Sequence, residues 1–380
     1  MLRAYKYRIY PNEEQKVTLE KTFGCCRFVY NWALEYRSKI YKEEKHDTSA
    51  FDLMKIINSK IKSENPWLKE VDSQALNYSI MHLNAAFQNF FKKNSKYPSF
   101  KKKHSKQSFT TYGTVCRVNF EDNTIKIPKI SKIKAVFHRI CNGDRIHKIT
   151  ISKEADGKYY ASILTNTFEP IPEKMTISPE STIGIDMGVA SFAVVSNGEV
   201  FHNQHLYDRN KTKINSLHRS LSRKVKGSAS YCRTRVKLAK SLGKLKRQRM
   251  DFIHKVTSHL TNENQVSAIC IEDLDIKAML RNHSIARAIS DVSIYEFFKV
   301  LSYKCEWNGI NLIKIVRYMP SSKMCSNCSY VNRNLKLTTR HWTCPECGMH
   351  HDRDYNASVN IKNFGLETLR LRNTEVKRAE

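Results

Sequence analysis

Two features that membrane and secreted proteins need are missing from this sequence. Its 380 residues contain no apolar run of about 20 residues, the length that a helix needs to cross a bilayer. The first residues, MLRAYKYRIYPNEEQ, lack the apolar segment of a secretory signal peptide. We therefore expect a protein that works inside the cell.

Acidic residues are scarce. The chain has 36 Asp and Glu against 65 Lys and Arg, which leaves a formal net charge of +29, and Arg209–Met250 contains no acidic residue at all. Because so many like charges repel one another in a compact fold, we expect them to neutralise a polyanion. The 18 Tyr and 17 Phe favour nucleic acid over a membrane surface, since aromatic rings stack on bases.

The pattern of a disulfide framework is also missing. Seven of the eleven cysteines are scattered, and an odd number of scattered thiols fits a reducing compartment. These cysteines stand at positions 25, 26, 116, 141, 232, 270 and 305.

The other four cysteines form two CxxC pairs separated by fifteen residues: Cys325 with Cys328, and Cys344 with Cys347. This spacing is typical of tetrahedral Zn²⁺ sites. Four sulfur ligands leave no position for a water molecule, so we expect a structural zinc ion; redox-active pairs are the alternative. One of three nearby histidines could also replace a thiolate: His341, His350 or His351.

The first half of the chain predicts strands interrupted by helices. Residues 3–9 alternate apolar and basic side chains, which indicates a strand, and Asn12 is a predicted N-cap for helices that continue to about Lys93. Residues 110–168 hold short apolar runs separated by turn signals and predict further strands. Together these strands suggest a small β-barrel that a helical bundle interrupts.

The second half, after a linker at 169–181, predicts an α/β domain. Residues 181–196 have the pattern of a strand, a tight turn and a strand, and Val266–Ile271 is an apolar run of strand length. Arg209–Met250 predicts two basic helices that line nucleic acid. Because strands and helices alternate, we expect a sheet between layers of helices.

Three acidic residues occupy comparable places in this domain. Asp186 ends the first predicted strand, Glu272 ends a later one, and Asp354 lies at a predicted helix start. Carboxylates at the ends of sheet strands converge at one edge, where they can hold two divalent cations about 4 Å apart for phosphodiester hydrolysis. Oxygen ligands favour Mg²⁺ or Mn²⁺. The alternatives are a salt bridge for Glu272 and a helix cap for Asp354.

Five motifs resemble those of the TnpB family of insertion-sequence proteins, in this order: GIDMG, IEDL, RNHSIARAISD, PSSKMCSNC and HDRDYNAS. The N-terminal stretches YKYRIYPNEEQ, FVYNWAL and YPSFKKK are similar as well, so the resemblance covers nearly the whole chain. Members of this family are RNA-guided DNA endonucleases related to the type V CRISPR effectors. One small departure is the ending Asn-Ala-Ser, where Ala is commoner as the third residue.

The resemblance implies a RuvC-like nuclease domain with an RNase H-like fold. In it, Asp186, Glu272 and Asp354 would be the catalytic acids and the ligands of Mg²⁺ or Mn²⁺, with Asp352 a close neighbour of the third. The role of Arg287 stays open between packing and phosphate contact. The implied multidomain α+β architecture is a wedge-type β-barrel (1–10 and 107–170), a helical recognition domain (11–106), the nuclease domain (181–320 and 349–366), a zinc-ribbon insertion (321–348) and a disordered tail (367–380).

The resemblance also implies the partners. We expect a guide RNA from the transposon end, a double-stranded DNA target with a short adjacent motif, and a protein monomer. The expected location is the cytoplasm of a prokaryote, at the nucleoid when the protein is bound to DNA. Three other functions remain open: a guided repressor that only binds DNA, a transposase that joins strands, and a zinc-ribbon RNA-binding protein. The last leaves the three acids without a role.

Overall fold

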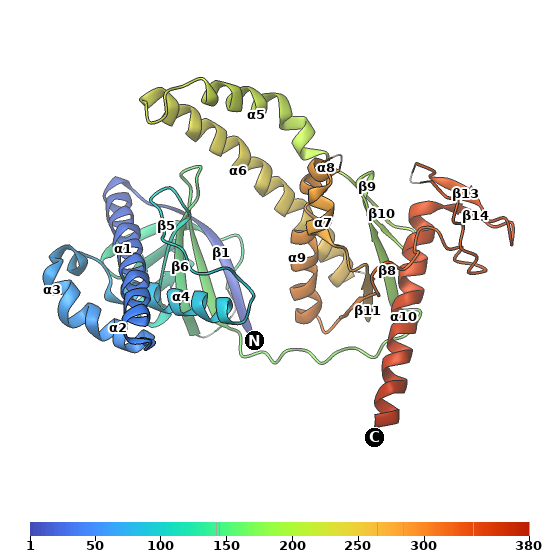
Figure 1. Cartoon of the computed structure of the whole chain (residues 1–380), viewed down its shortest axis with the longest axis horizontal. Helices are drawn as coiled ribbons and strands as arrows, with labels where there is room; N and C mark the ends of the chain where they lie inside the picture. The colour runs from blue at the N-terminus through green and yellow to red at the C-terminus, as the bar shows by residue number, and fades with distance from the viewer. Residues whose placement is uncertain (142, 144, 264, 284, 337, 380) are drawn as a thin grey trace. The chain divides into compact units, whose positions relative to one another are not determined.

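The computed structural model describes residues 1–141, 143, 145–263, 265–283, 285–336 and 338–379. These residues form two compact units, Met1–Pro170 and a second one from Ile171 onward (Figure 1). The boundary falls inside the predicted linker at 169–181. Each unit has its own sheet and its own buried core.

A seven-stranded antiparallel sheet is the framework of the first unit. Its order is β2-β6-β7-β1-β5-β4-β3, with β2 and β3 at the two edges in the described part of the chain. The sheet is therefore open in this part of the chain and fits the expected β-barrel as a half-barrel. The strands are β1 (Leu2–Tyr10), β2 (Gln107–Tyr112), β3 (Arg117–Asn119), β4 (Thr124–Ile127), β5 (Ile130–Val136), β6 (Arg145–Lys153) and β7 (Tyr159–Asn166).

Helices fill the long interval between β1 and β2. Asn12 caps the first of them, as predicted, because its side chain accepts the Gln15 N–H while the Gln15 side chain accepts the Asn12 N–H. The helical elements are α1 (Glu13–Glu44), α2 (Ala50–Ile56), the π-helical turn η1 (Ile57–Ile61), α3 (Lys62–Glu64), the 3₁₀ turn η2 (Pro66–Glu70) and α4 (Ser73–Phe91); a short 3₁₀ turn, η3 (Gly113–Val115), follows β2.

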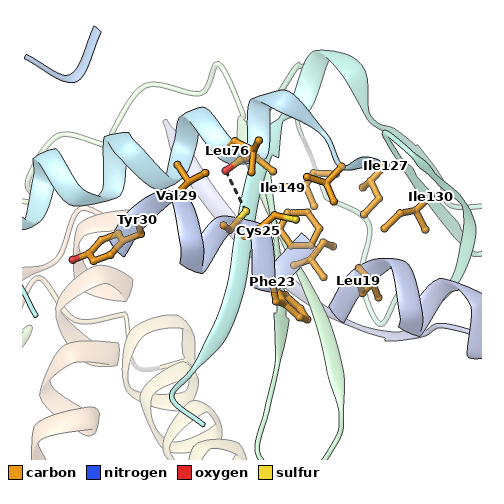
Figure 2. Close-up of a cluster of buried hydrophobic side chains, with 14 of the residues drawn as sticks. Leu19, Phe23, Cys25, Val29, Tyr30, Leu76, Ile127, Ile130 and Ile149 are labelled. Atoms are coloured by element: carbon orange, nitrogen blue, oxygen red, sulfur yellow. Dashed lines mark hydrogen bonds between the residues drawn. The ribbon is translucent and has the colours of Figure 1, made fainter. Parts of the chain in front are cut away.

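The helices and the sheet of this unit share one hydrophobic core. Figure 2 shows Leu19 and Phe23 of α1 and Leu76 of α4 close to Ile127 and Ile149 from the sheet. The side chains meet because α1 and α4 each bury an apolar stripe of helical period. The segment 11–106, which we expected as a separate helical domain, is thus packed on the sheet as part of the same compact unit.

A five-stranded mixed sheet organises the second unit, in the order β10-β9-β8-β11-β12. The three strands β8, β11 and β12 run parallel, while β9 and β10 continue from β8 as an antiparallel meander. The strands are β8 (Thr182–Met187), β9 (Ser191–Val195), β10 (Val200–His202), β11 (Ala268–Ile271) and β12 (Asn311–Lys314).

Helices cover both faces of this sheet, as expected for an α/β domain. One face packs on α6 and α9, and the opposite face packs on α10 (Figure 1). The helices are α5 (Leu206–Ser222), α6 (Ala229–Ser258) with a π-helical end η4 (His259–Glu263), α7 (Ile276–Arg281), α8 (Ala286–Val292), α9 (Ile294–Trp307) and α10 (Arg353–Ala379).

The segment between β12 and α10 carries the four paired cysteines and a two-stranded ribbon, β13 (His341–Thr343) with β14 (His350–Asp352). After it, α10 continues to Ala379 and so includes 367–379, the segment for which we expected a disordered tail. Residue 380 lies outside the described residues. Among the described helices, none has the length and apolar composition needed to cross a membrane.

Candidate functional site

Two of the three predicted acids lie at the ends of neighbouring parallel strands. Asp186 belongs to β8, and Glu272 directly follows β11. The strands pair Ile185 with Ile271, so the next residue of each is an acid. The pairing runs from Thr182 with Ala268 to Ile185 with Ile271, and both strands are buried along this stretch.

The third acid, Asp354, is the second residue of α10. This helix passes so close to β8 that a Cβ atom at Gly184 would collide with the backbone of Ser358 and Lys362. At Gly188, in the turn that follows β8, a Cβ atom would also lie close to backbone, 2.9 Å from the carbonyl oxygen of Ser191. The start of α10 is capped by Asp352, whose carboxylate accepts the Tyr355 N–H at 2.8 Å. Capping therefore falls to Asp352 and leaves Asp354 for another role.

The electrostatics of Asp186 indicate that the three carboxylates act on one another. Burial, together with the smaller effect of the charges of Glu272 and Asp354, raises the pKa of the Asp186 carboxyl to about 8. Arg353 and Arg340 lower that pKa, and by less. Like charges that repel in this way are relieved by a proton or by bound cations, so the donor set fits divalent metal ions.

Two of the acids also have protein partners. Glu272 accepts a hydrogen bond from the Ser321 hydroxyl at 2.5 Å. The two carboxylate oxygens of Asp354 lie 3.1 and 3.0 Å from Nη1 of Arg340, which reaches them from just before β13. Sequence reasoning missed both partners. Ser321 belongs to the PSSKMCSNC motif, but nothing in the local pattern of Arg340 distinguishes it from the many other arginines.

The four paired cysteines form a compact ligand group. Their sulfur atoms all lie within 4.8 Å of one another, with 3.7 Å between Cys325 and Cys347 and 3.6 Å between Cys328 and Cys344. A tetrahedral ion with Zn–S bonds of about 2.3 Å requires sulfur atoms about 3.8 Å apart. The four-cysteine cluster could therefore hold zinc. Within the described residues, it is the one group of three or more His, Cys, Asp or Glu side chains with this geometry.

The two knuckles of the cluster have the same backbone hydrogen bonds. The carbonyl of Cys325 accepts from the Ser329 N–H at 2.9 Å, and the carbonyl of Cys344 accepts from the Gly348 N–H at 2.9 Å. Ser329 and Gly348 both have positive φ angles, 64° and 71°. Hydrogen bonds from the backbone N–H of Met349 and the side chain of Asn327 lower the pKa of the Cys347 thiol, which favours the thiolate that metals bind.

The neighbouring histidines differ in position. Nε2 of His351 lies 3.0 Å from the sulfur of Cys325 in a buried environment, so it can donate a hydrogen bond to that thiolate. His341 and His350 stack on each other at the exposed face of the ribbon. With four sulfur atoms already grouped, no histidine is required as a ligand.

The helices α5 and α6 form a hairpin (Figure 1), and its sequence is rich in Lys and Arg. Arg219, Arg223 and Lys224 line a polar depression together with Ser216 and Ser220. The base of the hairpin is anchored by Asp291 in the RNHSIARAISD motif, which accepts from Arg249 at 2.6 Å and from the Tyr207 N–H at 3.1 Å. Arg287 of the same motif is exposed on α8.

Comparisons with known proteins agree with these features. Residues 1–46 match a helix-turn-helix domain model, HTH_OrfB_IS605; residues 167–283 match OrfB_IS605, described as "Probable transposase"; and residues 295–361 match the Cas12f1-like TNB domain. The chain is 36% identical to a protein of Streptomyces pristinaespiralis named "Putative RNA-guided DNA endonuclease", over 96% of this chain and 89% of that one. It is 28% identical to "Putative RNA-guided DNA endonuclease InsQ" of Escherichia coli (strain K12), over 97% and 93% of the two chains.

A solved structure of a Cas12f1-sgRNA-target DNA complex is similar as well. Its TM-score is 0.61, at 14% sequence identity, and the match covers 96% of this chain and 99% of that chain. At this identity the match shows a shared fold. The chain is thus a mixed α/β protein of several parts, similar in fold to Cas12f1.

Proposed function

The chain belongs to the TnpB family of RNA-guided DNA endonucleases, and on this premise we propose that it hydrolyses DNA phosphodiester bonds at Asp186, Glu272 and Asp354. Membership rests on the 36% identity to a relative that the chain matches along 89% of its length. The observation that carries the assignment of the site is that Asp186 and Glu272 end neighbouring parallel strands, and the raised pKa of Asp186, whose causes include the charges of the other two acids, agrees with it. Groups perturbed in this way cluster at functional sites.

The carboxylates supply the ligand set for two Mg²⁺ or Mn²⁺ ions. When bound, such ions activate water and stabilise the leaving oxygen of the phosphodiester. The contribution of the chain itself is to position the three acids. Parallel strands hold Asp186 and Glu272 side by side, Ser321 orients the Glu272 carboxylate, and α10 brings Asp354 over the end of β8. Asp186 must lose its proton to act as a ligand, and Arg340 and Arg353 favour that loss.

The four-cysteine cluster would hold a structural zinc ion. Its four sulfur positions fill a tetrahedral site and leave no place for a reacting water. The cluster lies in the segment between β12 and α10, so it braces the chain that leads to Asp354. In this proposal the zinc ion takes no part in the chemical step.

The nucleic-acid partners would be a guide RNA from the transposon end and a double-stranded DNA target. The net charge of +29 and the acid-free segment Arg209–Met250 supply the positive surface that such a complex requires. The basic depression on α5 lies in that segment and suits phosphate contacts, which position a strand without reading its sequence. Guide pairing would then read the target.

Strand joining is the second candidate function, because the match at residues 167–283 is described as "Probable transposase". The same metal site could direct a 3′-hydroxyl instead of water at the phosphorus. The products separate the two reactions: free 5′-phosphate ends indicate hydrolysis, and joined strands indicate transposition. A protein that binds its target and yields neither product would be a guided repressor.

The test is to express the gene with its native flanking DNA, purify the protein and sequence the RNA that accompanies it. We expect one abundant RNA that overlaps the 3′ end of the gene and continues into the adjacent sequence. A DNA target that matches the 3′ segment of this RNA should be cleaved with Mg²⁺ by the native chain and not by Asp186→Ala. Random cellular RNA, or no RNA, would contradict guided cleavage.

A further inference from the structure

Two buried asparagines join α10 to the chain that leads to the four-cysteine cluster. Asn356 and Asn360 lie one helical turn apart, and their side chains are 1% and 0% exposed. Both direct their amide groups at the backbone of residues 321–326. We propose that Asn356, Asn360 and Ser321 are positioning residues, through which metal occupancy at the cysteines sets the geometry of Glu272 and Asp354; this inference rests on the proposed function of those acids.

Asn356 holds the backbone on both sides of a cysteine ligand. Its Nδ2 donates to the carbonyl of Met324 at 2.7 Å, and its Oδ1 accepts from the N–H of Ser326 at 2.9 Å. The residue between these two is Cys325. Asn356 stands two residues after Asp354 in the first turn of α10, so a shift of Cys325 displaces the segment that carries Asp354.

Asn360 is connected to Glu272 through Ser321. Its Nδ2 donates to two carbonyls at 2.7 Å, those of Ser321 and Met324. The hydroxyl of Ser321, which is itself only 6% exposed, donates to Glu272 at 2.5 Å. The same loop therefore contacts the proposed metal ligand on β11 and the amide on α10.

These hydrogen bonds are costly to break because the groups that form them are buried. A buried amide that loses its partner leaves unpaired polar groups in a low-dielectric interior, so the contacts tend to persist or fail together. Ordering of Met324–Ser326 by a metal-bound Cys325 would then order both α10 and Ser321. By thermodynamic reciprocity, a change at the cysteines that favours this arrangement also favours divalent ions at the acids.

If the network of Ser321, Asn356 and Asn360 is purely structural, substitutions in it should change only the stability of the protein. A positioning role also predicts a change in the affinity of the acids for divalent cations while zinc remains bound. Partners that orient a metal ligand typically change metal affinity by about 10- to 100-fold when they are removed. Affinity for Mn²⁺ therefore distinguishes the two roles.

The experiment uses the full chain, with zinc content measured by elemental analysis and free Mn²⁺ measured by electron paramagnetic resonance during titration. Ser321→Ala should keep its zinc and bind Mn²⁺ about tenfold more weakly than the native chain. Ser321→Thr, which retains a hydroxyl, should restore most of the affinity. Ser326→Ala is the matched control, because the network uses the Ser326 backbone N–H and no contact of its side chain, and it should bind Mn²⁺ like the native chain.

Asn356→Ala tests whether the network connects the cysteines to the acids. It should lose zinc to a chelator faster than the native chain and bind Mn²⁺ more weakly. Native Mn²⁺ affinity in zinc-loaded Ser321→Ala would overturn the inference, even if Asn356→Ala fails to fold. If Asp186→Ala leaves Mn²⁺ binding unchanged, the proposed metal site itself is wrong, and that failure is distinct from a failure of the network.

Discussion

The two candidate metal sites of the second unit are built in opposite ways. The cysteine cluster comes from one short segment, in which two tight turns with matching hydrogen bonds each present two sulfur atoms. The acids come from β8, the end of β11 and the start of α10, and two of them are held by Ser321 and Arg340. The cysteine sulfur atoms lie within 4.8 Å of one another, whereas the described acids form no group of this kind.

This difference shows how ligand chemistry and local structure are related. A CxxC knuckle needs only a turn, so four thiolates can gather with little help from the rest of the fold. Carboxylates that repel one another need rigid strands and a packed helix to hold them together, and protein cations offset part of their charge. The cysteine cluster should therefore govern local folding, and the acids should govern catalysis.

The largest expected effect is on catalysis at the acids. Asp186→Asn should reduce DNA cleavage by at least about 10³-fold, because it removes a charged ligand where transition-state charge is stabilised. RNA and DNA binding should persist, since the substitution preserves shape. Cleavage assays and binding titrations on the same preparation check both. Asp208→Asn, on the exposed surface of α5, is the control, and loss of binding together with cleavage would count against the assignment.

The next effect is on folding at the cysteines. Cys344→Ser should lose its zinc and destabilise the segment between β12 and α10 by about 3 kcal/mol or more, which lowers the melting temperature by roughly 6–12 °C. Elemental analysis and thermal unfolding measure the two consequences. Cys232→Ser removes a scattered thiol and should change neither. Full zinc content and native stability in Cys344→Ser would end the assignment of a structural site.

A smaller effect tests the packing that brings Asp354 to the other acids. Gly184→Ala places a methyl group where the backbone of α10 approaches β8, and overpacking of this kind costs about 1–3 kcal/mol. Cleavage should fall as well, because α10 carries Asp354. Gly24→Ala in α1 is the control, because its methyl group would make only an ordinary contact of 3.9 Å with the Arg27 side chain. Unfolding free energies close to native for Gly184→Ala would show that α10 can move without cost.

The last expected effect, which depends on a single titrating group, is a pH dependence of stability without added Mg²⁺ or Mn²⁺. The folded-state pKa of Asp186, about 8, lies above the ordinary value of 3.8, so the folded protein holds a proton that the unfolded chain releases. Stability should therefore fall as pH rises from about 4 to about 8, by at most about 1.4 kcal/mol per pH unit. Asp186→Asn should remove this contribution. Denaturant titrations of the native chain and Asp186→Asn at pH 6 and pH 8 give the unfolding free energy of each. If it changes with pH by the same amount in both proteins, Asp186 does not hold a proton in the folded state.

Much of the second unit could be predicted from local patterns. Apolar runs identified β8 and β11, and the residues that end them, Asp186 and Glu272, lie side by side as the strand-end argument requires. The CxxC spacing predicted a sulfur group that the structure brings within 4.8 Å. The assignment of the acids as metal ligands remains a proposal.

Other features depend on contacts between distant segments and had no local signal. The sheet of the first unit is open because β2 and β3 do not pair in its described part, which the strand pattern could not reveal. The partners Ser321 and Arg340, and the amides of Asn356 and Asn360, are ordinary polar residues until the fold places them. The close approach at Gly184 likewise depends on α10 crossing β8.

The sequence by itself determined which residue types are available: four thiolates at metal spacing, three acids at element ends, and a large excess of positive charge. Only the tertiary structure decided how they are connected. The covalent chain keeps the two cysteines of each CxxC turn near each other, and the fold of one short segment brings the two turns to sulfur separations of 3.6 and 3.7 Å. The acids and their supporting hydrogen bonds come from strands and a helix far apart in sequence, so only packing and register could set their distances.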